Sequence, residues 1–312
     1  MTTILIAGGS GFIGSAVARA LAQRPDTRLR CLSRAPDAAR ARLGALYQEY
    51  VAGDVTRPET LDRALAGAEV VIGAAQFANF PIERPARGLT FDAVDRQGTE
   101  HLVAAAKRAG ASRYLYLSGM GADPDSRWPW FRAKGRAEAA IAAAGVPATI
   151  FRPSWVYGPG DRSLNRFVGF ARRLPFVPVI GSGEERVWPV FVDDLAAIVA
   201  QAIDLPTAGR IFDVGGPREL SMNEILRTML AVMRLRRPLL HAPPLFPRLA
   251  ATVMQALLPN PPLTPGAIDF LLTAGGDVDT TALRAVFQIR LTPLREGLET
   301  YLAPGRRAAG GG

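Results

Sequence analysis

Three glycines near the amino terminus have the spacing of a phosphate-binding loop. They follow an apolar run and precede a pattern typical of an amphipathic helix. Glycine permits a tight turn at the first position, leaves room for a diphosphate at the second and lets helix pack on strand at the third. The N–H groups and dipole at the helix start also favour phosphate. The pattern predicts a nicotinamide dinucleotide site. Its residues are Gly8, Ser10, Gly11, Phe12, Ile13 and Gly14.

The end of the next predicted strand bears on the choice between NAD(H) and NADP(H). Proteins that bind NAD usually carry an acid about 20 residues after the glycines, where it holds the ribose. Residues 27–36 contain no Asp or Glu. Ser33 and Arg34 stand there instead and would suit a 2′-phosphate, with Arg40 or Arg42 assisting. We therefore expect NADP(H) rather than NAD(H). The alternative is that Arg34 is a solvated loop residue.

The elements that must position this loop alternate along the first half of the chain. Continuous apolar runs predict buried parallel strands, and periodic patterns predict the helices between them. We expect strands at 4–7, 29–33, 50–52, 70–74, 113–117 and 148–151, and helices at 11–23, 60–66, 95–109 and 134–144. This order predicts an α/β fold, a doubly wound parallel-sheet Rossmann domain.

After residue 152 the elements shorten, and proline, glycine and arginine become frequent. Ser221 and Glu224 have the spacing of a capping box. We expect a Rossmann domain of residues 1–155, to which 185–215 returns. A smaller, irregular carboxyl-terminal lobe would comprise 156–184 and 216–304, and a disordered tail 305–312.

Several motifs resemble those of the extended or atypical short-chain dehydrogenase/reductases, over nearly the whole chain. They are GGSGFIG at 8–14, GD at 53–54, DRQGT at 95–99, YLYLSGMGA at 114–122, RPSWVYGPGD at 152–161 and VFVDDLA at 190–196. Within that family, the stretches at 262–265, 271–272 and 292–298 are similar to the subgroup that contains the 39 kDa accessory subunit of respiratory complex I.

The resemblance implies further roles. The implied cofactor contacts are at the adenine (Asp54 and Val55), along the channel (Ala74 and Ala75), at the nicotinamide ribose (Lys134) and beside the nicotinamide (Pro153 and Val156). Ser118 has the place of the family's substrate-orienting hydroxyl, so that Ser118 and Lys134 are the implied catalytic residues.

One departure from the family bears on catalysis. Catalytic members carry Tyr-x-x-x-Lys, in which the phenol transfers a proton and the lysine lowers its pKa. Here Trp130 occupies the tyrosine position before Lys134, and an indole N–H only donates. Either proton transfer has been lost, or Ser118, a water or Tyr157 supplies it. Trp130 would otherwise be an aromatic wall or lid.

Two functions follow. The first is an NADP(H)-binding protein with weak or no ordinary dehydrogenase activity and a structural, assembly or redox-sensing role, with a respiratory complex or another protein as partner. The second is an active NAD(P)-dependent reductase or epimerase that acts on a nucleotide sugar or an isoprenoid-quinone intermediate.

A basic and apolar segment, Arg234–Leu258, suggests a docking surface. Arg234, Arg236 and Arg237 precede apolar residues at helical spacing. Such a segment can lie on an anionic membrane or pack on a partner. The simpler alternative is that it covers the core of the second lobe.

Composition excludes several other classes. The net charge is +9, but the arginines are scattered, which does not favour a nucleic-acid protein. The single cysteine, Cys31, and two histidines make a zinc site improbable on chemical grounds, and we expect no metal. No basic leader or long apolar run is present, so we expect a cytoplasmic protein that contacts a membrane at most peripherally.

Overall fold

The computed structural model describes residues 1–77, 80–258, 261, 263–273 and 276–304. The predicted tail 305–312 and residue 262 of the carboxyl-terminal motif lie outside these residues. The chain forms two compact units. The first comprises Met1–Pro153, Asp193–Val214 and Asp279–Ile289, and the second Ser154–Val192, Gly215–Val278 and Arg290–Gly312. Whether these are independent domains with the predicted boundaries stays a prediction.

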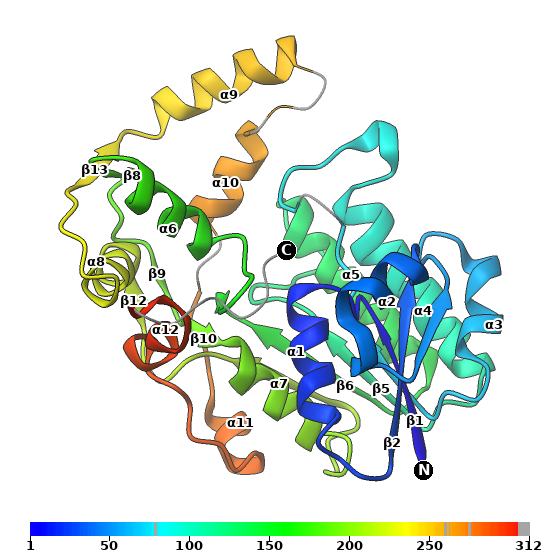
Figure 1. Cartoon of the computed structure of the whole chain (residues 1–312). Coiled ribbons are helices and arrows are strands. Elements are labelled where there is room, and N and C mark those ends of the chain that lie inside the picture. The colour runs from blue at the N-terminus through cyan, green and yellow to red at the C-terminus, as the bar shows by residue number, and fades with distance from the viewer. Residues whose placement is uncertain (78–79, 259–260, 262, 274–275, 305–312) are drawn as a thin grey trace. The chain divides into compact units, whose positions relative to one another are not determined.

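The first unit is built on a seven-stranded parallel sheet with the order β11-β6-β5-β4-β1-β2-β3 (Figure 1). The strands are β1 (Thr2–Ala7), β2 (Thr27–Ser33), β3 (Glu49–Ala52), β4 (Val70–Gly73), β5 (Arg113–Leu117), β6 (Ala148–Pro153) and β11 (Arg210–Val214). The strand order reverses at β1, which pairs with both β2 and β4. This is the doubly wound Rossmann arrangement, and the predicted fold class is confirmed. In folds of this kind, ligands bind at the carboxyl ends of the strands, where the order reverses.

Helices connect these strands. They are α1 (Phe12–Leu21), α2 (Pro36–Leu43), α3 (Leu61–Leu65), α4 (Gly98–Arg108), α5 (Pro129–Ala144), α7 (Val192–Gln201) and α11 (Thr281–Val286), with the short turns η1 (Gly44–Leu46), η2 (Pro58–Thr60), η3 (Pro85–Arg87) and the π-helical η4 (Phe91–Gln97). Right-handed crossovers from β1 to β2 and from β4 to β5 run in opposite directions along the sheet, so α1 and α4 cover opposite faces. Helices α4 and α5 pack against each other.

The segment Asp279–Ile289 belongs to the first unit, although the sequence analysis places it with the second lobe. Its Phe287 is buried, and its ring centroid lies 6.1 Å from that of Phe151 and 5.1 Å from that of Phe212. These rings extend the hydrophobic core at the edge formed by β6 and β11. A short apolar segment does not show in its own sequence which core it joins, and that explains the difference.

The second unit is smaller and irregular, as predicted. Its elements are β7 (Val156–Tyr157), α6 (Leu164–Arg173), β8 (Val177–Ile180), β9 (Arg186–Val187), β10 (Val190–Phe191), β12 (Leu220–Ser221), α8 (Met222–Val232), β13 (Leu239–Ala242), α9 (Leu245–Leu257), α10 (Pro265–Thr273) and α12 (Leu294–Leu302). Strand pairs β7–β10, β8–β13 and β9–β12 form three two-stranded sheets, and α8 packs on α12. The capping box is confirmed, because Glu224 N donates to Ser221 Oγ at 3.2 Å and Ser221 N to Glu224 Oε2 at 2.7 Å. In the part of the chain that the structure describes, no helix has the length and apolar character of a membrane span.

Candidate functional site

The glycine loop between β1 and α1 is packed so closely that two of its glycines have no room for a side chain. Gly8 has a φ of +80°, and a Cβ there would lie 2.4 Å from the Ala74 carbonyl oxygen. A Cβ on Gly14 would lie 2.3 Å from the Gly8 carbonyl oxygen. Both neighbours are main chain and cannot give way, so these positions require glycine.

Gly11 faces open space instead. A Cβ there would meet only the Gly8 carbonyl oxygen, at 3.1 Å, and Gly11 is exposed. It stands at the N-cap of α1, where no side chain caps the helix and no acid occupies the first turn. The main-chain N–H groups of Phe12 and Ile13, with the positive end of the helix dipole, therefore face the exposed start of α1, where a phosphate group is stabilised. These residues fit the diphosphate of a dinucleotide.

Tyr47 supports the glycine loop through a hydrogen bond to its main chain. This residue was not identified from the sequence. Its hydroxyl donates to the Gly9 carbonyl oxygen at 2.7 Å, and a Cβ on Gly9 would lie 2.5 Å from that hydroxyl. Burial raises the pKa of Tyr47, which keeps the hydroxyl protonated as a donor. On the exposed side of the loop, the Arg42 guanidinium donates to the Ser10 carbonyl oxygen. Arg42 is thereby held beside the predicted phosphate cradle.

The carboxyl ends of four neighbouring strands meet at one edge of the sheet. Ala7 of β1 pairs with Leu32 of β2 and with Gly73 of β4, and Ser33 pairs with Ala52 of β3. The residues at and beyond these strand ends include Gly8, Ser33, Arg34, Asp54, Val55, Ala74 and Ala75. The parallel register thus brings together most of the predicted cofactor residues.

Local hydrogen bonds fix the loops at the predicted adenosine end of this edge. Ser33 Oγ accepts from Ala35 N at 3.1 Å, while Arg34 is exposed. Asp54 Oδ1 accepts from the main-chain N and the hydroxyl of Thr56, at 2.9 and 2.8 Å. Val55 is buried beside Asp54. These local bonds fix the two loops, and Arg34, like Arg40 and Arg42, is exposed to solvent.

Lys134 makes an ion pair that the sequence did not reveal. Its Nζ lies 2.9 Å from Asp95 Oδ1, 3.4 Å from the Tyr116 hydroxyl and 3.3 Å from the Leu117 carbonyl oxygen. Asp95 is fully buried and the Lys134 side chain is 13% exposed. Burial acts to lower the pKa of Lys134, but Asp95 and Tyr116 reverse this effect and raise it above the ordinary value. Lys134 is thus a fixed cation at the end of β5.

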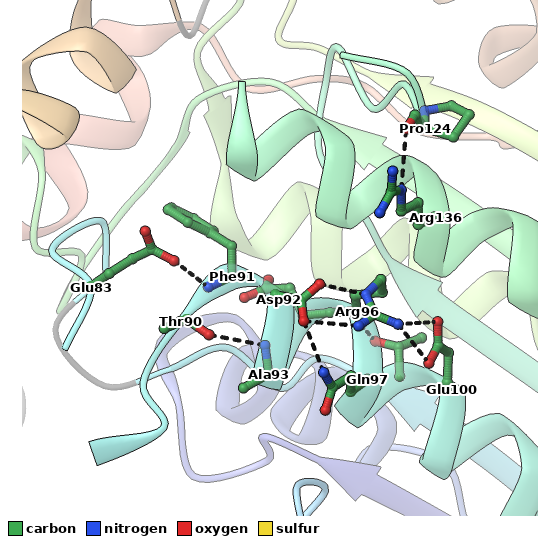
Figure 2. Close-up of polar contacts among 12 residues, drawn as sticks. Glu83, Thr90, Phe91, Asp92, Ala93, Arg96, Gln97, Glu100, Pro124 and Arg136 are labelled. Atoms are coloured by element: carbon green, nitrogen blue, oxygen red, sulfur yellow. Dashed lines mark hydrogen bonds and ion pairs between the residues drawn. The ribbon is translucent and has the colours of Figure 1, made fainter. Parts of the chain in front are cut away.

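The π-helical turn η4, which carries Asp95, is held in place by its own polar contacts (Figure 2). The Thr90 hydroxyl caps its first turn by accepting a main-chain N–H bond at 3.0 Å. Arg96 pairs with Asp92 at 2.5 Å and with Glu100 at 3.0 Å. Since η4 also packs on α5, these contacts keep the Asp95 carboxylate in register with Lys134.

Trp130 lies one helical turn before Lys134 on α5 and is 5% exposed. Its ring stacks on Trp128, with centroids 5.1 Å apart and planes at 18°. It contacts Phe131 edge-on at 5.6 Å and Phe91 of η4 at 6.2 Å. The tyrosine position of the family is therefore filled by an indole within an aromatic cluster.

The Ser118 hydroxyl is engaged by a buried carboxylate. Ser118 Oγ donates to Glu138 Oε1 at 2.5 Å. Arg152 holds the same carboxylate through Nε at 3.0 Å and through Nη2 at 2.5 Å. Glu138 lies on α5 one turn beyond Lys134, and neither it nor Arg152 was predicted. A proton held in this contact is not available for a substrate unless the contact breaks.

Three further predicted residues lie at the end of β6 or just after it. Pro153 ends β6 in the first unit, whereas Val156 and Tyr157 form β7 of the second unit. Tyr157 is fully buried, with its ring centroid 5.5 Å from that of Phe191. A Cβ on Gly297 would lie 2.3 Å from its hydroxyl. Tyr157 therefore belongs to the core of its unit, which argues against it as the alternative proton donor.

The glycine loop offers main-chain N–H groups suited to a dinucleotide diphosphate, and Lys134 is held at the end of β5. A titratable phenol is missing from the position four residues before Lys134. Among the described residues, no group of three or more His, Cys, Asp or Glu side chains could hold a metal ion.

Comparisons with known proteins agree with this geometry. A family model described as NAD(P)H-binding matches residues 8–171. The NADH dehydrogenase [ubiquinone] 1 alpha subcomplex subunit 9, mitochondrial, of Arabidopsis thaliana is 30% identical over 233 residues, which cover 73% of this chain and 57% of that subunit. The chain thus spans less than two thirds of that relative.

Two other proteins broaden the comparison. The ceramide reductase of Caulobacter vibrioides is 33% identical over 241 residues, which cover 77% of this chain and 73% of the reductase. The crystal structure of UDP-glucuronic acid 4-epimerase from Bacillus cereus, in complex with UDP-glucuronic acid and NAD, has a TM-score of 0.73 at 18% identity and covers 96% of this chain and 97% of its own. At that identity the likeness concerns the fold alone. The glycine loop, the sheet order and these relatives together place the chain in the NAD(P)H-binding family, among the extended short-chain dehydrogenase/reductases.

Proposed function

We propose that this chain binds NADP(H) at the carboxyl edge of the seven-stranded sheet and has weak or no ordinary dehydrogenase activity. The bound nucleotide would serve a structural, assembly or redox-sensing role. The observation that carries this proposal is the Asp95–Lys134 ion pair, at 2.9 Å, one helical turn from the buried Trp130. In this proposal, the glycine loop holds the phosphates, whereas an indole instead of a phenol stands four residues before Lys134 on the catalytic side.

The proposed binding residues divide by the part of the dinucleotide they would hold. The N–H groups of the glycine loop would hold the diphosphate, Asp54 and Val55 the adenine, and Lys134 the nicotinamide ribose. Ala74 and Ala75 would line the channel, and Pro153 and Val156 would border the nicotinamide. When bound, the nicotinamide supplies hydride transfer. The residues of this chain bind and orient it, and none of the predicted groups around Lys134 is placed as a titrating proton donor.

The preference for NADP(H) is supported by two arginines. Arg34 is exposed at the end of β2, and Arg42 is held at the Ser10 carbonyl oxygen. No acid competes with a 2′-phosphate in residues 27–36. Guanidinium groups bind phosphate through paired, charge-assisted hydrogen bonds.

Calorimetry with NADPH and NADH tests this preference. Arg34→Ala should weaken NADPH binding by roughly tenfold, the equivalent of one charge-assisted hydrogen bond, and leave NADH binding within about twofold. Arg63→Ala, at an exposed arginine on α3, is the matched control and should change neither. Equal affinities of the unmodified protein for both nucleotides would overturn the preference.

Restoring the missing phenol tests the proposal of weak turnover. In Trp130→Tyr, Lys134 still pairs with Asp95 and the Ser118 hydroxyl still donates to Glu138, so we expect no gain in NADPH oxidation with ketones, quinones or nucleotide sugars. The measurement is the absorbance of NADPH under turnover, with nucleotide binding as the control for folding. A gain of a hundredfold or more, the usual contribution of a positioned general acid, would show an active site that lacks only its acid.

We propose a respiratory complex as the partner. The support is the Arabidopsis relative, which is named as a subunit of NADH dehydrogenase. Purification of the complex from cells that express a tagged chain should recover both, and recovery of the chain alone would contradict this partner. We further propose a cytoplasmic location with peripheral membrane contact, which depends on helix α9.

The second candidate is an active NAD(P)-dependent reductase or epimerase. It is favoured by the 33% identity to a protein named ceramide reductase and by the presence of both Ser118 and Lys134. A substrate would have to break the Ser118–Glu138 contact to use that hydroxyl. Ser118→Ala would abolish turnover in this case, whereas it would not affect a protein whose nucleotide is structural.

A further inference from the structure

Helix α9 of the second unit presents its apolar face to solvent. Leu245, Leu249, Val253 and Leu257 recur every four residues and therefore share one face of the helix. They are 71%, 63%, 49% and 74% exposed, and the neighbouring Phe246 is 65% exposed. An amphipathic helix of a globular core buries such a stripe. The exposure therefore rules out the alternative in which this stripe covers the core of its own unit.

The helix is attached through its other side. Ala251 is its buried residue, α9 packs on α10, and Arg248 forms an ion pair with Asp269 of α10. Figure 1 shows α9 beside α10 at the periphery of the second unit. Leu240 of β13 and Leu271 of α10 are exposed as well. The contact with α10 fixes the helix and leaves the stripe uncovered.

The segment that leads into α9 and forms it carries charge of a single sign. The sequence contains no Asp or Glu between Glu224 and Asp269. The same stretch carries Arg227, Arg234, Arg236, Arg237 and Arg248. Arg234 and Arg236 are exposed just before β13, which leads into α9. A partner for this surface must therefore be both apolar and anionic.

We propose that α9 and the preceding arginines, Arg234 and Arg236, dock the chain on an anionic lipid bilayer. The 13 residues of α9 extend about 20 Å, too short to cross a hydrocarbon core of about 30 Å. The helix therefore lies in the interface, with its stripe among the acyl chains and the arginines at the headgroups. A bilayer accepts a convex stripe of leucines without a matching groove, whereas a protein partner would need an acidic groove of this shape. The inference rests on the proposed peripheral role but not on dinucleotide binding.

Vesicle sedimentation tests the apolar stripe. The full chain should sediment with phosphatidylcholine vesicles that contain phosphatidylglycerol, and only weakly with phosphatidylcholine alone. The double variant Leu249→Ser and Val253→Ser should reduce the partition coefficient at least tenfold. Ile211→Ser removes a comparably exposed side chain from the first unit, where Ile211 is 46% exposed, and should leave binding unchanged. Unaltered NADPH binding by calorimetry would show that each variant is folded and would separate this test from that of the cofactor site.

The arginines are tested in the same assay. Arg234→Gln with Arg236→Gln should weaken binding to the anionic vesicles roughly tenfold at low salt and leave the weak binding to neutral vesicles unchanged. Arg63→Gln is the matched control. A stripe that binds lipid without help from the arginines would give equal binding to both kinds of vesicle and would overturn the electrostatic part of the proposal.

A fluorescent label shows whether α9 itself enters the bilayer. Cys31 is buried, and burial raises its thiol pKa to about 11, so a maleimide dye should label Leu249→Cys selectively. Its emission should shift to the blue and gain intensity with anionic vesicles. The proposal would be overturned if the unmodified chain did not bind vesicles, or if the emission of the dye did not change. It would also be overturned if a protein partner covered the stripe and the chain did not bind vesicles.

Discussion

The glycine loop and the surroundings of Lys134 lie at the same edge of the first unit, but they are built from different atoms. The loop is made of main chain: Gly8 and Gly14 approach carbonyl groups so closely that a Cβ has no room. Around Lys134 the geometry is made by side chains, chiefly the carboxylates of Asp95 and Glu138. Because the main-chain loop depends chiefly on its glycines, and its side-chain supports Tyr47 and Arg42 lie outside the Lys134 cluster, it tolerates changes that remove a catalytic phenol. The comparison explains how a chain can keep a cofactor site beside an altered catalytic side.

The largest expected effect comes from the side-chain half of this comparison. Asp95→Asn removes the anion from a largely buried lysine and leaves the cation without compensation. We expect a loss of about 3 to 5 kcal/mol in the free energy of unfolding at pH 7, measured by urea denaturation. The double variant Asp95→Asn with Lys134→Met removes both charges and should recover most of this loss. A single variant as stable as the unmodified chain would show that the pair does not hold the site.

The pH dependence of the same variant sharpens the comparison. In the unmodified chain the pKa of Lys134 is raised. Its contribution to the free energy of unfolding is therefore fully present below the pKa of about 10.4 that a lysine has in the unfolded chain, and it is lost as the pH rises above that pKa. In Asp95→Asn, burial should lower that pKa below the unfolded value. The loss of unfolding free energy in the variant, relative to the unmodified chain, should then be largest at neutral pH and should shrink as the pH rises toward about 10.4. Urea denaturation at pH 7 and pH 10 measures the difference, and a constant deficit would contradict the assignment.

The main-chain half is tested by Gly14→Ala. Its Cβ would lie 2.3 Å from the Gly8 carbonyl oxygen, so strand, loop and helix must separate. We expect a loss of about 1 to 3 kcal/mol in unfolding free energy and loss of NADPH binding in calorimetry. Gly266→Ala is the control, since that glycine is also helical and a Cβ there meets nothing within 4 Å. Similar behaviour of the two variants would mean that the loop is not as tightly packed as its contacts imply.

The smallest effect is expected where a side chain supports the main-chain loop. Tyr47→Phe removes the hydrogen bond to the Gly9 carbonyl oxygen and should cost about 1 kcal/mol in unfolding free energy. It should also weaken NADPH binding a few-fold, because the loop loses its support. Tyr50→Phe removes a similar bond, to the Gly44 carbonyl oxygen, and should lower stability without a change in affinity. Equal affinities of the two variants for NADPH would show that the Tyr47 hydroxyl does not contribute to the cofactor site.

The sequence by itself determined the features that depend on local spacing. The glycine loop, the alternation of strands and helices, and the Ser221–Glu224 capping box each involve residues a few positions apart, and the structure has all of them. The replacement of the family's tyrosine by Trp130 is likewise visible from its distance to Lys134. Strand ends came together as predicted because parallel strands share an edge.

Only the tertiary structure decided which distant side chains meet and which apolar faces are covered. Lys134 of α5 pairs with Asp95 of η4, and Ser118, just after β5, bonds to Glu138 of α5. Phe287 joins the core of the first unit, whereas the leucines of α9 stay in solvent, although both segments are apolar in sequence. An apolar or charged residue does not specify its partner through its type. Its environment is set by packing among elements far apart along the chain, and that information lies in the fold as a whole.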